Sequence, residues 1–226
     1  MAVVFLANLL QQNKYFFRIF FAFIILGFIA LLVFEHGDWI VFFSDQRNFW
    51  VDNFFRYWTK VGEEPAYIIA IILLCFVKFR YVVFVPIIGL VVTVVANLLK
   101  AFFAQPRPRL FYEMNGLLEQ INLIEGVILN SGATSFPSGH TMSGFALFSF
   151  VAFCLPQKKV VAGFLFLNAF LVGLSRIVLV QHFLRDIYVG GIIGVLLAIL
   201  IFYLQSLLSD NPQKWWNKSI LREKVA

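Results

Sequence analysis

The chain has 226 residues, of which 61% are hydrophobic and 13% are charged. This composition excludes an ordinary water-soluble domain of this length and predicts an integral membrane protein. The formal net charge is +6, but the basic residues divide between short loops and one separate cluster. Anionic lipid head groups explain the short basic loops, so we predict membrane lipids as neighbours and no nucleic-acid partner.

Six apolar stretches are predicted to be membrane-spanning helices, since each crossing needs about 20 mostly apolar residues. In chain order they cover residues 16–34, 65–77, 81–99, 141–155, 160–179 and 187–207. The first is expected to be retained, because its apolar stretch is too long for a signal peptide and no small-residue cleavage site follows it. We therefore expect an all-α fold, with residues 1–226 forming a single membrane domain of six transmembrane helices.

Two predicted loops on the same side of the membrane are longer than a simple connection requires. The first, residues 35–64, is rich in Phe, Trp and Tyr after Phe49. Such aromatic residues collect at the membrane interface, so a short interfacial helix is expected there. The second, residues 101–138, is broken by several prolines and glycines and is expected to be irregular.

Basic residues in the other loops predict the orientation, because short loops rich in Lys and Arg stay on the cytoplasmic side. They are Lys14, Arg18, Lys78, Arg80, Lys158, Lys159, Lys214, Lys218, Arg222 and Lys224. We therefore expect both termini in the cytoplasm and the two longer loops on the outer side. With no evident eukaryotic sorting signal, a bacterial inner membrane is the favoured location.

Three polar clusters lie at the outer ends of the last four predicted helices, where charged residues near a membrane suggest function. They are KAFFAQPRP at 100–108, PSGH at 137–140 and SRIVLVQHFLRD at 175–186. Residues 100–186 thus carry the candidate site. Lys100, Arg107 and Arg176 provide cations suited to phosphate oxygens.

The remaining polar residues of these clusters suit phosphoryl transfer. Ser138 and Gly139 precede a helix whose free amides favour an anion, although the Ser138 hydroxyl could equally serve as a helix cap. His182 and Asp186 are four residues apart, so on a helical segment they would share a face and Asp186 would accept a hydrogen bond from the imidazole. His182 could then attack as a nucleophile, and His140 could protonate the leaving oxygen.

Taken one at a time, these residues have simpler explanations, such as a snorkelling Lys100 or an ordinary turn at PSGH. The rival function is a small membrane transporter or lipid flippase, whose charges would line a pathway. No internal repeat supports it, and the charges gather at one side of the membrane, so a hydrolytic site is the simpler interpretation.

In this order and spacing, the clusters resemble the type 2 phosphatidic acid phosphatase superfamily. The matching pattern is Lys, six residues and Arg-Pro; then Pro-Ser-Gly-His; then Ser-Arg, five residues, His, three residues and Asp. The resemblance implies catalysis by His182, His140 and Asp186, with a phosphohistidine on His182. It implies phosphate binding by Lys100, Arg107, Ser138, Gly139 and Arg176, and no metal or other cofactor.

The resemblance also implies a site at the outer membrane face and a lipid phosphate substrate. The superfamily includes soluble vanadium haloperoxidases with a similar pocket, but the six predicted spans favour the lipid phosphatase branch. Undecaprenyl pyrophosphate, phosphatidylglycerol phosphate, phosphatidic acid and lipid A all remain open as substrates. No sequence feature indicates an oligomeric state.

Overall fold

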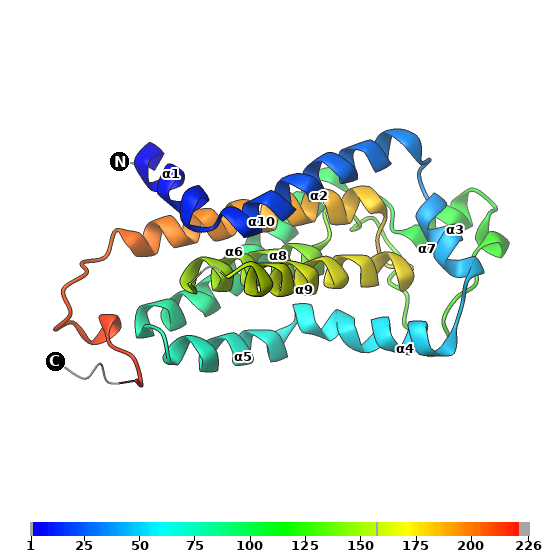
Figure 1. Ribbon diagram of the computed structural model, residues 1–226. Coiled ribbons are helices and arrows are strands. Elements are labelled where there is room, and N and C mark those ends of the chain that lie inside the picture. The colour runs from blue at the N-terminus through cyan, green and yellow to red at the C-terminus, as the bar shows by residue number, and fades with distance from the viewer. Residues whose placement is uncertain (1, 157, 222–226) are drawn as a thin grey trace.

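The computed structural model describes residues 2–156 and 158–221 (Figure 1). Helices make up 74% of the structure, and no strand occurs among the residues described. The expected all-α fold is confirmed. The helices are α1 (Ala2–Gln12), α2 (Lys14–Val33), α3 (Asp38–Asp45), α4 (Phe49–Trp58), α5 (Glu64–Cys75), α6 (Phe79–Phe103), α7 (Pro108–Met114), α8 (Gly139–Cys154), α9 (Lys159–Val178) and α10 (Leu184–Ser206), with short 3₁₀ turns η1 (Thr59–Gly62), η2 (Leu118–Gln120) and η3 (Trp215–Asn217).

Four of the described helices, α2, α9, α10 and the helix starting at Phe79, are long and apolar enough to cross a membrane. They support an integral membrane protein. The expected second and fourth spans correspond to α5, with 12 residues, and α8, with 16. At about 1.5 Å per residue, α5 and α8 are shorter than a hydrocarbon core of about 30 Å. A count of six crossings therefore stays a prediction.

Helix α8 lies at the centre of the bundle, packed against α6, α9 and α10. Most of its residues are buried, as expected of a helix that is apolar on all sides. Glycines on α10 let its backbone approach α8 closely. A Cβ atom at Gly190 would lie 2.8 Å from the Ser138 carbonyl oxygen, and one at Gly194 would lie 2.5 Å from that of Met142. This close packing places the start of α10 beside the start of α8.

The first of the two longer predicted loops, residues 35–64, holds two helices, α3 and α4, where the sequence predicts one. Helices α4 and α5 follow one another along one side of the bundle, joined by η1 (Figure 1). The η1 turn packs against α8 and α9. The segment between the first two predicted spans therefore reaches the middle of the molecule as well as its surface.

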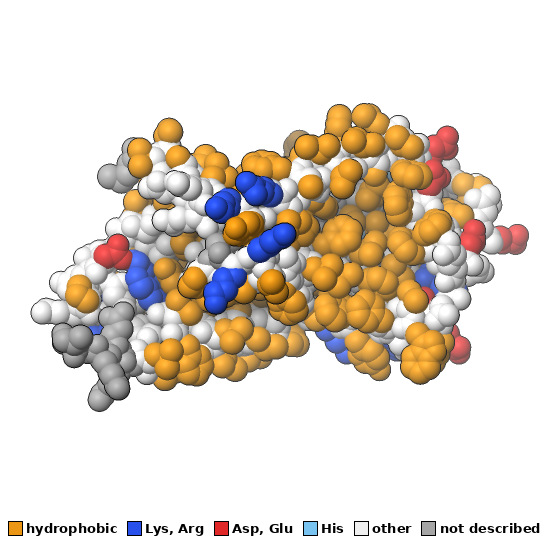
Figure 2. Space-filling model, viewed as in Figure 1, with side chains coloured by type: hydrophobic (Ala, Val, Ile, Leu, Met, Phe, Trp, Pro, Cys, Tyr) orange, Lys and Arg blue, Asp and Glu red, His pale blue; other side chains and the backbone are white. Residues whose placement is uncertain are grey.

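The ends of the molecule differ in charge. In Figure 1, α1 and η3 lie at one end, and α3 and α7 lie at the other. In the matching view of Figure 2, hydrophobic side chains cover the region between, with basic groups nearer the first end and most acidic groups at the second. This distribution suits a protein whose middle faces lipid. Arg222 and Lys224, which entered the orientation argument, lie outside the described residues.

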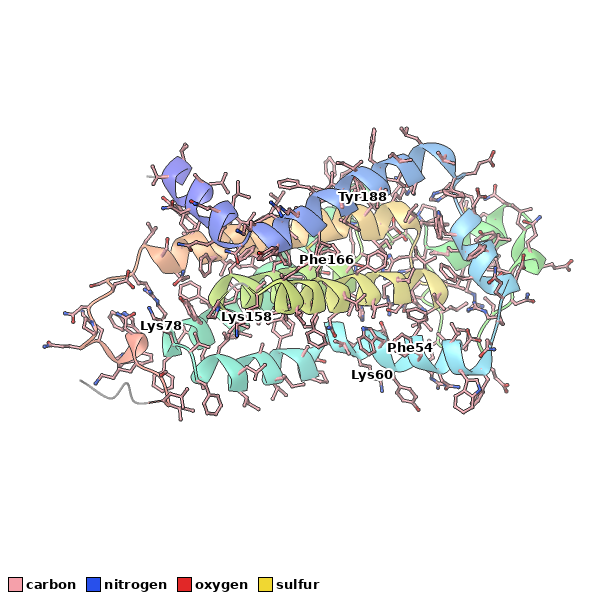
Figure 3. The ribbon with its side chains drawn as sticks, in the orientation of Figure 1. Phe54, Lys60, Lys78, Lys158, Phe166 and Tyr188 are labelled. Atoms are coloured by element: carbon pink, nitrogen blue, oxygen red, sulfur yellow. The ribbon has the colours of Figure 1, made fainter. Side chains whose placement is uncertain are left out.

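Helix α2 packs on the bundle through aromatic contacts and a hydrogen bond from α10. The hydroxyl of Tyr188, on α10, donates a hydrogen bond to the Ile24 carbonyl oxygen at 3.1 Å, in the region labelled in Figure 3. A Cβ atom at Gly27 would lie 2.5 Å from the Tyr188 ring. Glycine at this position therefore leaves room for the Tyr188 ring between α2 and α10.

Candidate active site

Lys100 and Arg107 lie on either side of the sharp turn that ends α6. Lys100 is in the last turn of the helix, and Ala104 follows in the left-handed region with φ 46°. Arg107 is the residue before α7 and is only 7% exposed. Its Nε donates to the Thr134 hydroxyl at 3.1 Å, and its Nη1 lies 3.4 Å from both oxygens of Gln181. Arg107 thus joins the first cluster to the segment before PSGH and to the third cluster.

Burial lowers the pKa of the Arg107 guanidinium from its ordinary value, while the charge of Asp186 raises it. Arginine has so high an ordinary pKa that the group stays charged. A fixed positive charge is therefore available beside the third cluster.

The PSGH segment caps α8 and touches the other two clusters. The Ser138 hydroxyl accepts hydrogen bonds from the Thr141 hydroxyl at 2.9 Å and from the Thr141 backbone N–H at 3.4 Å. The Ser138 backbone N–H donates to the Asp186 carbonyl oxygen at 3.0 Å. A Cβ atom at Gly139 would lie 3.5 Å from Lys100 Nζ, so glycine leaves space beside that ammonium group.

His182 and Asp186 make the expected contact, but not from one face of a helix. His182 lies in the turn between α9 and α10, where the N–H groups of Gln181 and His182 donate to the Arg176 carbonyl oxygen at 2.8 and 3.1 Å. Asp186 lies in the first turn of α10. His182 Nδ1 is 3.3 Å from Asp186 Oδ2. A helix cap, instead of helical periodicity, therefore pairs the two side chains.

The Asp186 carboxylate is fully buried and receives several donors on one oxygen. Oδ2 accepts from the Phe183 backbone N–H at 3.0 Å and from the Ser135 hydroxyl in a short hydrogen bond. The Ser135 hydroxyl also lies 3.4 Å from His182 Nδ1. Such a fixed carboxylate sets which ring nitrogen of His182 holds the proton.

His182 is 1% exposed, and its burial lowers the pKa of the imidazole from 6.5 to about 3. The hydrogen bond and charge of Asp186 oppose this shift, whereas the nearby Arg176 and Arg107 add to it. The ring is therefore neutral near pH 7. No hydrogen bond within residues 2–156 and 158–221 engages its Nε2 atom, so that nitrogen retains its lone pair for another group.

Arg176 lies near the end of α9 and is 6% exposed. Its Nη1 donates to the Thr59 hydroxyl of η1 at 2.7 Å. Its Nε is buried and has no hydrogen-bond partner in the described part of the chain. A buried guanidinium with an unused donor favours an anion as the missing partner.

A cavity of about 640 Å³ begins beside the first two clusters and runs between α5, α6 and α8. Lys100, Gly139 and His140 line its polar part, while Ile68 and Val92 line its apolar part. Ile68 is 57% exposed, so the cavity opens on the outer surface of the bundle. Its shape offers room for a molecule with an anionic head and an apolar body.

Several residues around the site were not found from the sequence. They are Thr59, Glu63, Thr134, Ser135 and Gln181. Ser135 stands three residues before Ser138, so its closeness to PSGH was an available signal. Glu63 Oε1 is 2.8 Å from His140 Nε2, although 77 residues separate them, and no spacing in the sequence indicates this contact.

The candidate residues do not form an evident metal site. No group of three His, Cys, Asp or Glu side chains gathers in a way that could hold a metal ion, as far as the described residues extend. Metal independence itself is a prediction about activity.

Comparisons with known proteins show similarity over the region that holds the three clusters. A family model described as the PAP2 superfamily matches residues 77–209. The chain is 33% identical over 130 residues to Probable lipid phosphate phosphatase 4 of Arabidopsis thaliana, covering 48% of this chain and 42% of that protein. It is 33% identical over 82 residues to Phosphatidylglycerophosphatase B of Bacillus subtilis, covering 33% and 40%.

A third relative, the Bacitracin transport permease protein BcrC of Bacillus licheniformis, is 38% identical over 94 residues, covering 41% of this chain and 42% of that protein. The chain thus spans about two fifths of the length of the curated relatives it matches.

Two solved structures resemble the fold over nearly their whole length. Aquifex aeolicus LpxE has a TM-score of 0.62 and 28% identity, covering 76% of this chain and 98% of that chain. A PAP2 type phosphatidylglycerolphosphate phosphatase of Bacillus subtilis has a TM-score of 0.56, covering 92% and 97%; at 21% identity it supports the fold alone. Because the family model covers more than half of the sequence and includes all three clusters, the chain belongs to the PAP2 superfamily.

Proposed function

We propose that the protein is a membrane lipid phosphatase that removes phosphate from a lipid head group without a metal or other cofactor. The substrate is a phosphomonoester or a pyrophosphate. In this proposal, His182 and His140 act on the substrate and Asp186 positions His182. Lys100, Arg107, Arg176, Ser138 and Gly139 form the phosphate pocket, in a single membrane domain spanning residues 1–226.

The chemistry proceeds in two steps. In the first, neutral His182 attacks phosphorus through Nε2, a P–N bond forms, and the P–O bond to the lipid breaks while His140 gives its proton to the leaving oxygen. In the second, His140 takes a proton from water, which attacks the phosphohistidine and releases phosphate. Lys100, Arg107 and Arg176 stabilise the negative charge on the transferred group.

The observation that carries this proposal is the clustering of cations around the two histidines: Arg176 and Arg107 act on His182, and Arg176 and Lys100 act on His140. Lys100 and His140 also line the cavity that continues between α5, α6 and α8. An apolar tail could lie against Ile68 and Val92 while its phosphate reaches the cations. No charged head group would then have to enter the hydrocarbon.

The orientation supports action on the outer leaflet. Lys78 and Lys158 lie toward the end of the bundle that holds α1 and η3 (Figure 3). The positive-inside rule assigns this end and both termini to the cytoplasm. The site is at the opposite ends of α6 and α9, hence extracytoplasmic, and the proposed membrane is a bacterial inner membrane crossed by six helices.

The direct test is phosphate release from a panel of lipid phosphates by protein purified in detergent. We expect turnover of at least one of undecaprenyl pyrophosphate, phosphatidylglycerol phosphate, phosphatidic acid or lipid A, and its loss in the His182→Ala variant. The name of the Bacillus licheniformis relative describes a transport permease, which keeps transport or lipid flipping as the second candidate. Lipid movement without phosphate release would favour that alternative.

A further inference from the structure

His140 has a carboxylate partner that lies outside all three clusters. Its Nε2 is 2.8 Å from Oε1 of Glu63, and both side chains are 35% exposed. Glu63 is the residue before α5, and its side chain makes no capping hydrogen bond to that helix. The carboxylate is therefore directed to the histidine instead of to the free amides that the start of α5 offers.

The position of Glu63 is fixed by its neighbours in η1. The Thr59 hydroxyl accepts from Arg176, and the Gly62 carbonyl oxygen accepts from the Ser143 hydroxyl at 2.8 Å. A Cβ atom at Gly62 would lie 2.6 Å from Val172 Cγ1 and 3.2 Å from the His140 carbonyl oxygen. This close backbone packing against α8 and α9 holds Glu63 at the site, unlike an acidic residue on a free loop.

The charges around His140 indicate what the Glu63 carboxylate does. Three charged groups face His140: Arg176 from α9, Lys100 from α6 and Glu63. Partial burial of the ring and the two cations disfavour its protonated form, and the carboxylate in hydrogen-bond contact favours it. A bound phosphate would offset the cations as well, so the protonated ring is best supported when substrate and Glu63 are both present.

We propose that Glu63 is a positioning residue for His140, which holds the imidazole of the general acid and stabilises its protonated form. This inference rests on the proposed lipid phosphatase function. With Nε2 held by Glu63, Nδ1 is the nitrogen left to give its proton to the leaving oxygen. The active site then contains two histidine–carboxylate pairs, one supplied by a motif and one by the chain between the first two predicted spans.

The dependence on leaving group tests this role. An alkoxide leaving group needs a proton from His140, whereas the p-nitrophenolate of p-nitrophenyl phosphate departs readily without one. Glu63→Gln keeps the size and an acceptor oxygen but removes the charge. Since general acid catalysis contributes about 10²- to 10⁴-fold, we expect kcat/KM for the lipid phosphate to fall at least about 10-fold. The fall for p-nitrophenyl phosphate should be below about 3-fold, because the acid step that Glu63 assists contributes little there.

Two further measurements separate positioning from a general structural effect. The alkaline limb of the Glu63→Gln profile of kcat/KM against pH should move to lower pH, because the imidazolium loses its nearest negative charge. Glu63→Asp, which restores the charge on a shorter side chain, should recover part of the lipid activity. The matched control is Glu119→Gln, which removes the same charge from an exposed side chain that makes no hydrogen bond among the described residues and does not line the cavity. It should leave both activities within about 2-fold, as a screened surface charge does.

Equal losses on both substrates in Glu63→Gln would overturn the inference, because they would indicate a structural role. Unchanged or increased activity would also overturn it, because the carboxylate would then be dispensable or would obstruct the phosphate. Wild-type protein that releases phosphate from neither substrate would instead contradict the proposed function itself.

Discussion

Asp186→Asn tests whether the Asp186 charge, or only its geometry, supports His182. Asn preserves the shape of the side chain, and its carbonyl oxygen can replace Oδ2 as acceptor for Phe183 N–H, Ser135 and His182 Nδ1. Its amide would replace Oδ1, which has no hydrogen-bond partner among the described residues but lies 3.6 Å from Arg185 Nε, so this ion pair would be lost as well. The substitution therefore removes a buried charge while leaving the hydrogen-bond pattern available.

The size of the effect follows from replacing a charged hydrogen-bond acceptor with a neutral one. A hydrogen bond to a charged group contributes about 1.5–3 kcal/mol, compared with about 1 kcal/mol for a neutral one. The difference is about 0.5–2 kcal/mol. Because the positive charge on His182 develops only during reaction, we expect kcat to fall by about 2- to 30-fold, at about 1.4 kcal/mol per factor of ten. His182→Ala should abolish turnover, because it removes the nucleophile.

The assay is steady-state phosphate release in detergent, with the thermal unfolding midpoint of each variant as the folding control. Ser135→Ala should cause a smaller loss, below about 10-fold, because it removes only one donor to the same oxygen. If Asp186→Asn were as inactive as His182→Ala while still folded, the carboxylate would be doing more than orienting and stabilising the ring. The reasoning above would then be refuted.

Three further predictions concern metal, pH and sidedness. Activity should persist in excess EDTA, because Lys100, Arg107 and Arg176 provide the positive charge that a metal ion would otherwise supply; strict dependence on added divalent metal would contradict this. Vanadate should inhibit, because it mimics the phosphorus under attack. The plot of kcat/KM against pH should be bell-shaped. Its acid limb should lie well below pH 6.5, because burial lowers the pKa of His182 to about 3 and only the neutral ring attacks. An acid limb centred near 6.5, after correction for the substrate phosphate's own ionisation near pH 6, would be inconsistent with that burial. In a chain carrying Cys75→Ala and Cys154→Ala, a cysteine at Glu113 should react with an impermeant reagent in intact cells, and one at Lys158 only after lysis; the reverse pattern would place the site in the cytoplasm.

The sequence was most informative where one residue type is needed at one spacing. The clusters at Lys100, Ser138 and His182 could be singled out because few types of side chain suit a phosphate group. The long apolar segments at α2, α6, α9 and α10 were likewise located, since composition alone predicts them. Their end residues shifted by a few positions, because helix ends depend on local capping that hydropathy does not report.

The parts that could not be predicted depend on contacts between distant segments. The Thr59 contact with Arg176 and the Gly62 contact with Ser143 join residues more than 80 positions apart. They exist only because η1 packs against α8 and α9. The hydrophobic periodicity of helices or strands in the sequence does not predict such packing. The pairing of His182 with Asp186 was expected from helical spacing, yet it arises from a turn and a helix cap, which give the same separation by a different geometry.

The contrast between the two histidines supports their different assignments. His182 is 1% exposed, and such burial favours the neutral ring that a nucleophile requires. The His140 side chain is 35% exposed, lines the open cavity and has the Glu63 carboxylate beside it, so solvent can return a proton to it after each turnover. If the roles were exchanged, the buried His182 would have to carry a positive charge as the acid, and the more exposed His140 would have to compete with water as the nucleophile. The difference in burial therefore favours attack by His182 and proton transfer by His140, independently of the family pattern.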